Sequence, residues 1–199
     1  MENKEERKIK ITGQANRYQI KKLTTTTNPD ERSQRVIIQK LKIEDSFFAV
    51  DKQKELLLKI HNKAENNLEV TFSGKEEERI YNIMIKQLEA KISSYKQQDK
   101  LKEIDPDETT AISVSSLVKH ILQCDVKCFY CHVRMMILYK QSRDPTQWTI
   151  DRIDNNLGHT VDNYVVACLG CNLKRRRQDL DKFNYTKNLT VLKCVSLNI

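Results

Sequence analysis

Two pairs of cysteines carry the clearest chemical signal in this chain of 199 residues. Each pair has the spacing Cys-x-x-Cys: Cys128 forms one pair with Cys131, and Cys168 forms the other with Cys171. This spacing places two thiolates on one tight turn, and two such turns supply the four sulfur ligands of a tetrahedral zinc site. Because four protein ligands leave no open coordination position, the predicted zinc is structural and takes no part in a reaction.

The other two cysteines and the start of the chain bear on the cellular compartment. Cys124 and Cys194 have no partner at metal-ligand spacing, and we interpret them as small apolar side chains. The first residues lack the apolar stretch of a signal peptide, and no segment is long and apolar enough to span a membrane. The sequence therefore predicts an intracellular protein in a reducing compartment, where cysteines bind metals and do not form disulfides.

Positive charge is concentrated around and behind the cysteine pairs. The formal net charge is +8, of which residues 111–199 contribute +6, from thirteen Lys and Arg against seven Asp. The densest basic run is Lys174, Arg175, Arg176 and Arg177. A cluster of this kind is typical of proteins that bind a phosphate backbone, so a nucleic acid is the predicted partner.

Composition divides the chain into segments. Residues 1–32 have no apolar period and are predicted to be a flexible basic arm, whereas 33–103 are predicted to be mostly helical, with a strand candidate at 68–72. A break that contains Pro106 marks a domain boundary. Beyond it lie the cysteine-bearing module and a C-terminal extension, at residues 112–180 and 181–199.

The strongest helix signal covers residues 75–100. Ser73 and Glu76 have the spacing of a capping box, in which each side chain bonds the backbone N–H of the other residue. Behind them, apolar residues recur every four positions, at Ile80, Met84, Leu88 and Ile92. This stripe packs either in the core of the chain or against a second copy in a homodimer.

Between the cysteine pairs the pattern predicts a strand, a loop, a second strand and a helix. The strands are expected at 147–153 and 164–167, the loop at 154–163, and the helix from Cys168 onward. Trp148, the single tryptophan, is either a core residue of this small unit or a stacking platform for a base.

This segment resembles the HNH endonuclease family, which has a ββα-metal fold. The matching residues are Ile150-Asp-Arg-Ile-Asp154, Gly158-His-Thr160 and Asp162-Asn-Tyr-Val-Val-Ala-Cys-Leu-Gly-Cys-Asn-Leu-Lys-Arg175. They cover about a quarter of the chain and are most similar to zinc-stapled members with Asn as the third signature residue. The resemblance implies an α+β protein, in which a helix-rich N-terminal region precedes a zinc-stapled HNH-like module that hydrolyses DNA.

The resemblance also assigns roles to individual residues. Asp151 and Asn172 would be oxygen ligands of a catalytic Mg²⁺ or Mn²⁺, which can neutralise phosphate charge. Asn163 would be the middle signature residue, whose amide holds the loop in shape. The basic run that begins at Lys174 would clamp the flanking phosphates.

One position departs from the family pattern. The general-base histidine of the family directly follows the aspartate, and here that position is Arg152, which cannot accept a proton from water. His159 is the other imidazole in the loop, and it either takes this proton or only holds the turn through hydrogen bonds. Arg152 either contacts the scissile phosphate or pairs with Asp154.

Three functions are therefore weighed: a metal-dependent endonuclease, a non-catalytic zinc-bound nucleic-acid-binding module that has lost its base, and a zinc module for protein interaction. The third leaves both the basic run behind the last cysteine pair and the polar set of Asp151, Asn163 and Asn172 unexplained. The residues do not distinguish DNA from RNA as the substrate.

Overall fold

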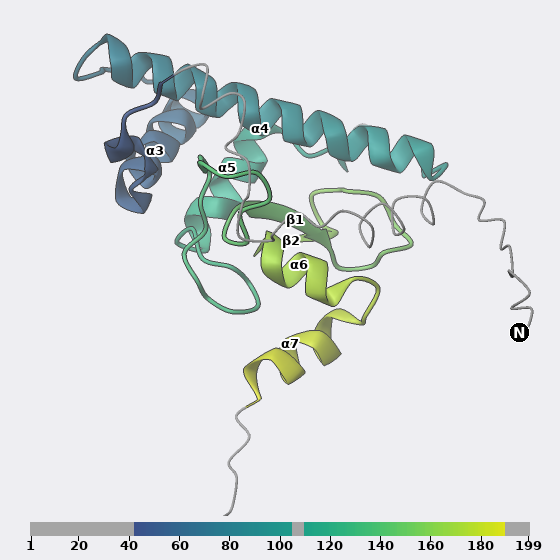
Figure 1. The fold of residues 1–199 in the computed structure, drawn as a ribbon. Helices are drawn as coiled ribbons and strands as arrows, with labels where there is room; N and C mark the ends of the chain where they lie inside the picture. Colours follow the sequence, from purple (N-terminus) through teal and green to yellow (C-terminus); the bar gives the residue numbers. More distant parts are fainter. Residues whose placement is uncertain (1–41, 105–109, 190–199) are drawn as a thin grey trace, which may run out of the picture. The chain divides into compact units, whose positions relative to one another are not determined.

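The structure is a computed structural model that describes residues 42–104 and 110–189, so the predicted arm at 1–32 lies outside the described residues. The elements are, in chain order, a 3₁₀-helix η1 (Asp45–Phe48), α3 (Val50–Asn66), α4 (Lys75–Leu101), α5 (Val114–Gln123), β1 (Trp148–Arg152), β2 (Tyr164–Cys168), α6 (Leu169–Arg175) and α7 (Leu180–Asn188). The described part of the chain thus joins helices to a small antiparallel sheet, as the α+β class predicts (Figure 1). None of the described helices is both long and apolar enough to cross a membrane.

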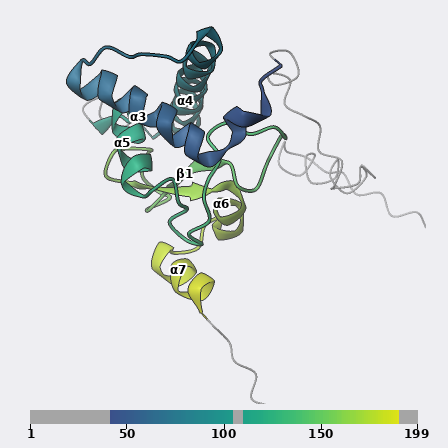
Figure 2. The same cartoon turned by 90° about the vertical axis from the view of Figure 1, so that its left-hand side faces the viewer.

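The two strands form a short hairpin-like pair that is buried on both faces. Trp148 pairs with Cys168 and Asp151 with Val165, and every residue of both strands is buried. Helix α4 runs along one side of this sheet and α6 lies on the other (Figures 1 and 2). Trp148 is 1% exposed, with the ammonium of Lys91 from α4 4.3 Å from its ring centre, so the prediction of a core tryptophan is confirmed.

The apolar stripe of α4 packs inside the chain. Ile80, Met84 and Leu88 are fully buried and Ile92 is 7% exposed, and they share one hydrophobic cluster with residues of α3, α5, β1 and β2. The core interpretation of the stripe is confirmed, and the stripe is not available to a second copy of the chain. The break around Pro106 does not separate two cores, because the cluster continues across it.

The start of α4 differs from the predicted capping box by one residue. The helix begins at Lys75, so Glu77 and not Glu76 accepts hydrogen bonds from the backbone N–H and the hydroxyl of Ser73, at 2.7 and 2.9 Å. Glu77 also accepts from Lys52 and Lys59 of α3. Burial alone would raise the pKa of Glu77, but these hydrogen bonds hold it well below its usual range. Glu77 therefore ties α4 to α3.

Two further segments differ from expectation or extend it. The strand candidate at 68–72 forms no strand and connects α3 to α4, with Phe72 packed edge-on against Tyr81 at 5.1 Å between ring centres. Part of the C-terminal extension forms α7, whose Phe183 is buried and packs edge-on against Tyr130 at 4.9 Å. The extension thereby supports a residue of the site described below.

Candidate functional site

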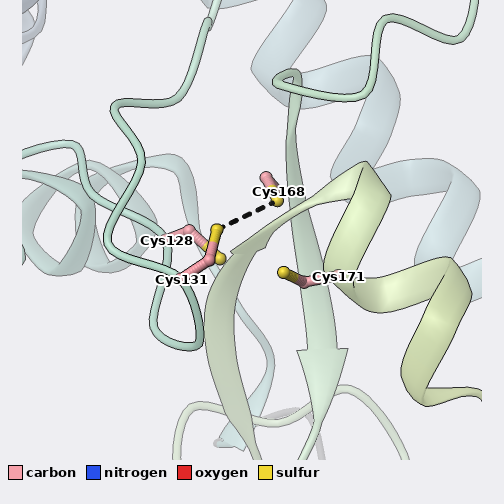
Figure 3. Close-up of side chains that lie close together, drawn as sticks. All are labelled: Cys128, Cys131, Cys168 and Cys171. Atoms are coloured by element: carbon pink, nitrogen blue, oxygen red, sulfur yellow. Dashed lines mark hydrogen bonds between the residues drawn. The ribbon is translucent and has the colours of Figure 1, made fainter. Parts of the chain in front are cut away.

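The four cysteines of the two pairs come together in one cluster (Figure 3). Their sulfur atoms all lie within 4.8 Å of one another, and the Sγ atoms of Cys131 and Cys168 are 3.8 Å apart. A zinc ion with four sulfur ligands at about 2.3 Å has edges of about 3.8 Å between sulfurs, so the cluster is close to the size that zinc requires. The prediction that Cys128, Cys131, Cys168 and Cys171 meet around one position is confirmed, and they are close enough to hold a metal ion.

Three separate elements position these sulfurs. Cys128 and Cys131 lie on a turn after α5, closed by a hydrogen bond of 3.0 Å from the N–H of His132 to the carbonyl of Cys128. Cys168 is the last residue of β2 and Cys171 lies in the first turn of α6. A bound ion would therefore pin the junction between β2 and α6 to the turn that follows α5.

The pKa values of the clustered thiols indicate that a cation would stabilise the cluster in its thiolate form. Interaction between the thiols of Cys128 and Cys168 lowers the pKa of Cys128 and raises that of Cys168, and burial raises the pKa of Cys171 to about 12. Further thiolates in this volume therefore need a positive charge among them, which zinc supplies. Cys124 lies outside the cluster and donates to the carbonyl of Ile121. His132, which directly follows Cys131 in the sequence, is exposed and is not a member of the cluster.

A cleft of about 990 Å³ lies next to the sheet and gathers most of the predicted site. Its walls come from β1, the loop after β1, α6, the turn between α6 and α7, the start of α7, and α4 with the turn that follows it. Among the predicted residues it is lined by Asp151, Arg152, His159, Asn172, Arg175, Arg176 and Arg177. Three residues on the α4 side line the same cleft and were not predicted from the sequence: Tyr95, Gln98 and Lys102.

Asp151 is buried and both of its carboxylate oxygens are engaged. Oδ1 accepts from Arg175 Nη1 at 2.8 Å and Oδ2 accepts from the hydroxyl of Tyr130 at 2.7 Å. Burial raises the pKa of Asp151, opposed by these two partners and by the charge of Arg152. The roles of Tyr130 and Arg175 at this carboxylate had no signal in the sequence.

Arg175 does not belong to an exposed phosphate clamp. It is 1% exposed and also donates to the carbonyls of Arg152 and Ile153. The reason is helical periodicity: Arg175 lies four residues after Cys171, so both face the buried side of α6, whereas its basic neighbours are exposed. The predicted clamp is therefore reduced to Lys174, Arg176 and Arg177.

Asn172 lies on the first turns of α6 and is fixed against β1. Its Nδ2 donates to Thr149 Oγ1 and to the carbonyl of Ile150, both at 3.1 Å, and its Oδ1 has no partner among the described residues. A free amide oxygen and a carboxylate with unused lone pairs are the ligand types that Mg²⁺ or Mn²⁺ takes. The donor chemistry of Asp151 and Asn172 fits such an ion, and the guanidinium of Arg175 competes with it for the carboxylate.

The loop after β1 is closed by Asn163. Its Nδ2 donates to the carbonyls of Asp154 and Gly158 at 3.0 and 2.9 Å, and its Oδ1 accepts from the N–H of Asp154 at 2.9 Å. Arg152 donates to the carbonyl of Leu157 at 2.9 Å, and its predicted partner Asp154 instead accepts from the N–H of Asn156. The expected pair of Arg152 and Asp154 is thus replaced by hydrogen bonds within the loop.

His159 is held by a residue of α4 that lies sixty positions earlier in the chain. Asp99 accepts from the backbone N–H of His159 through Oδ2 and lies against Nδ1 of its ring through Oδ1, both at 2.7 Å. The ring of Tyr95 stacks on the imidazole at 4.7 Å between centres. Both side chains of the Asp99–His159 pair are buried.

The same face of α4 also binds the edge of β1 that β2 leaves open. Lys91 donates to the carbonyl of Trp148, and the hydroxyl of Tyr95 accepts from the N–H of Ile150 at 3.0 Å. Lys91, Tyr95 and Asp99 are spaced by four residues, so one helical face serves the strand and the loop together. The sequence contains a signal for this surface, because a polar stripe at four-residue spacing beside the apolar stripe indicates a second contact surface on α4.

Comparison of the chain with protein-family models, with curated proteins and with solved structures finds no match.

Proposed function

We propose that this protein is a metal-dependent endonuclease that hydrolyses DNA phosphodiester bonds in a zinc-stapled ββα site of the HNH type. The observation that carries the proposal is a cleft lined by Asp151, His159 and Asn172, next to two antiparallel strands and a helix in the order that this type of site requires. The four-cysteine cluster at the start of that helix supports the same assignment.

The proposed roles follow from the side chains in the cleft. Asp151 and Asn172 would hold a Mg²⁺ or Mn²⁺ ion, which when bound neutralises phosphate charge and stabilises the leaving oxygen. His159 would take a proton from the attacking water through Nε2, since Nδ1 faces Asp99. The exposed Arg176 and Arg177 at the rim would neutralise neighbouring phosphates.

A second function is favoured by a specific observation. Arg152 stands where the family has its base, and Arg175 neutralises Asp151, the proposed metal ligand. One cation thus replaces the base, and a second one occupies the carboxylate that the metal ion needs. A non-catalytic zinc-bound module that binds nucleic acid through this basic cleft would have the same geometry. Such a protein binds DNA and does not cut it.

The deciding experiment is incubation of the zinc-loaded protein with supercoiled plasmid, with Mg²⁺, with Mn²⁺ or with EDTA. The nuclease predicts nicking that requires the added ion and that Asn172→Ala reduces by more than about 10²-fold, because an ion ligand is removed. Asn156→Ala is the matched control, since Asn156 lines the same cleft and its side chain is exposed. Parallel single-stranded DNA and RNA substrates identify the preferred nucleic acid.

Plasmid binding without nicking under every ion condition selects the non-catalytic module. Nicking that EDTA does not stop, or that Asn172→Ala leaves at the wild-type rate, contradicts the metal site proposed here. Absence of both nicking and binding contradicts both functions.

A further inference from the structure

We propose that Asp99 is a positioning residue that holds His159 in the tautomer with the proton on Nδ1, so that Nε2 is the proton acceptor of the reaction. The inference deepens the proposed nuclease and rests on it. It assigns a part of the site to α4, a helix far outside the segment that resembles the HNH family.

The geometry of the pair supports this role. A carboxylate only accepts hydrogen bonds, so the contact of 2.7 Å between Asp99 Oδ1 and His159 Nδ1 places a proton on Nδ1. The second bond, from the N–H of His159 to Oδ2, fixes the backbone of the same residue. Nε2 has no hydrogen-bond partner within the described ranges, and His159 is one of the residues that line the cleft together with Asp151 and Asn172.

The surroundings of the pair keep the imidazole rigid. Asp99 is 1% exposed and His159 is 8% exposed, and the Tyr95 ring covers one face of the imidazole. Tyr95 is itself fixed by the bond from Ile150, one residue before Asp151. Helix α4 thus contacts both His159 and the strand that carries Asp151, and it fixes the position of one relative to the other. A fixed relative position is the condition for an aligned proton transfer.

The charged and titratable groups that act on His159 most directly are Asp99 and Tyr95 from α4, Lys102 from the turn that follows α4, and Arg152 from β1. Three more charged groups line a second pocket together with His159: Lys96, Lys100 and Glu103. Burial lowers the pKa of His159, Asp99 raises it, and Arg152 and Lys102 lower it, with a net shift below the usual histidine value. The imidazole is therefore neutral at neutral pH, as a base must be. Activity should rise with pH through a value below about 6.5 and then stay level.

The variant Asp99→Asn separates positioning from loop support. The asparagine oxygen can still accept the N–H of His159, while its NH₂ group donates to Nδ1 and moves the ring proton to Nε2. A base in the wrong tautomer typically costs about 10² to 10⁴ in turnover. We expect kcat to fall by this factor with KM and zinc content unchanged, which is the pattern of a loss confined to the transition state.

Asp162→Asn is the matched control, because it makes the same chemical change at an exposed position of the same loop. It should leave kcat and its pH profile at wild-type values. A nicking protein in which Asp99→Asn keeps the wild-type rate and pH profile overturns the role of Asp99 and leaves the nuclease intact.

A second measurement needs no turnover and reads the tautomer in the wild-type protein. Long-range ¹H–¹⁵N correlation spectra of the wild-type side chains report the protonated nitrogen of each of the four histidines, and the signal of His159 is identified by its loss in His159→Gln. At pH 7.5 the proposal requires the neutral Nδ1–H form. An Nε2–H form or a cationic ring overturns it. A wild type with the Nδ1–H form that never nicks plasmid overturns the nuclease, and with it the catalytic use of the pair.

Discussion

Loss of the metal cluster should unfold the β1–β2–α6 unit and leave the N-terminal helices in place. The perturbation is Cys171→Ser, or removal of the metal with a strong zinc chelator. Cys171 is 3% exposed and joins α6 to the turn after α5 through the cluster. Removing one thiolate of four opens the site and leaves two buried thiols and one half-buried thiol with no cation among them.

The expected loss of helix follows from the lengths of the helices and from which of them lie next to the cysteine cluster. Helices α3, α4 and α5 have 17, 27 and 10 residues and contribute much of the apolar core that they share with the sheet. Helices α6 and α7 have 7 and 9 residues, and they lie next to the cysteine cluster and beyond it. Zinc in small zinc-bound units contributes about 10–16 kcal/mol, which is as large as the whole stability of an ordinary domain, about 5–15 kcal/mol. The sheet unit should therefore unfold completely, while about three quarters of the described α-helix remains.

The assay combines metal analysis, far-ultraviolet circular dichroism and two-dimensional amide spectra. We expect one zinc per chain in the wild type, loss of the β1 and β2 amide signals in Cys171→Ser, and about three quarters of the helical ellipticity retained. Cys124→Ser is the matched control, because Cys124 lies outside the cluster. A folded wild type without zinc, or zinc-free protein with unchanged β1 and β2 signals, refutes this reasoning. Loss of nearly all helical signal refutes the independence of α3, α4 and α5.

Two further predictions concern the charges of the cleft. Asp151→Ala should lower the free energy of unfolding by about 3–5 kcal/mol, since it leaves Arg175 buried without its ion partner, and replacing Arg175 by Met as well should recover most of this loss. Denaturant unfolding of the zinc-loaded protein measures the change in the free energy of unfolding, and a loss below about 1 kcal/mol counts against the buried pair. Replacing Lys174, Arg176 and Arg177 by Ala should reduce the slope of log binding constant against log salt by up to about 2.7, which is about 0.9 for each phosphate that the variant no longer neutralises; an unchanged slope shows that these exposed residues do not touch the backbone.

Features that depend on residues close together in the chain were determined by the sequence. The cysteine spacing predicted the cluster, because two Cys-x-x-Cys turns bring sulfurs together by local geometry and only the joining of the turns is long-range. The four-residue apolar period predicted a helix at 75–100, and α4 spans Lys75–Leu101. Alternation and β-branched residues predicted strands at 147–153 and 164–167, against Trp148–Arg152 and Tyr164–Cys168 in the structure.

The contacts that give the cleft its chemistry were decided only by the tertiary structure. Asp99 and His159 are sixty residues apart, and their meeting depends on how far α4 is rotated and shifted along β1, which no local period encodes. The same holds for the basic run, where the exposure of each residue depends on which side of α6 faces the sheet, so Arg175 is buried against Asp151. Sequence pattern fixes which residues share a helical face, and only the packing of that face against another element decides its partner.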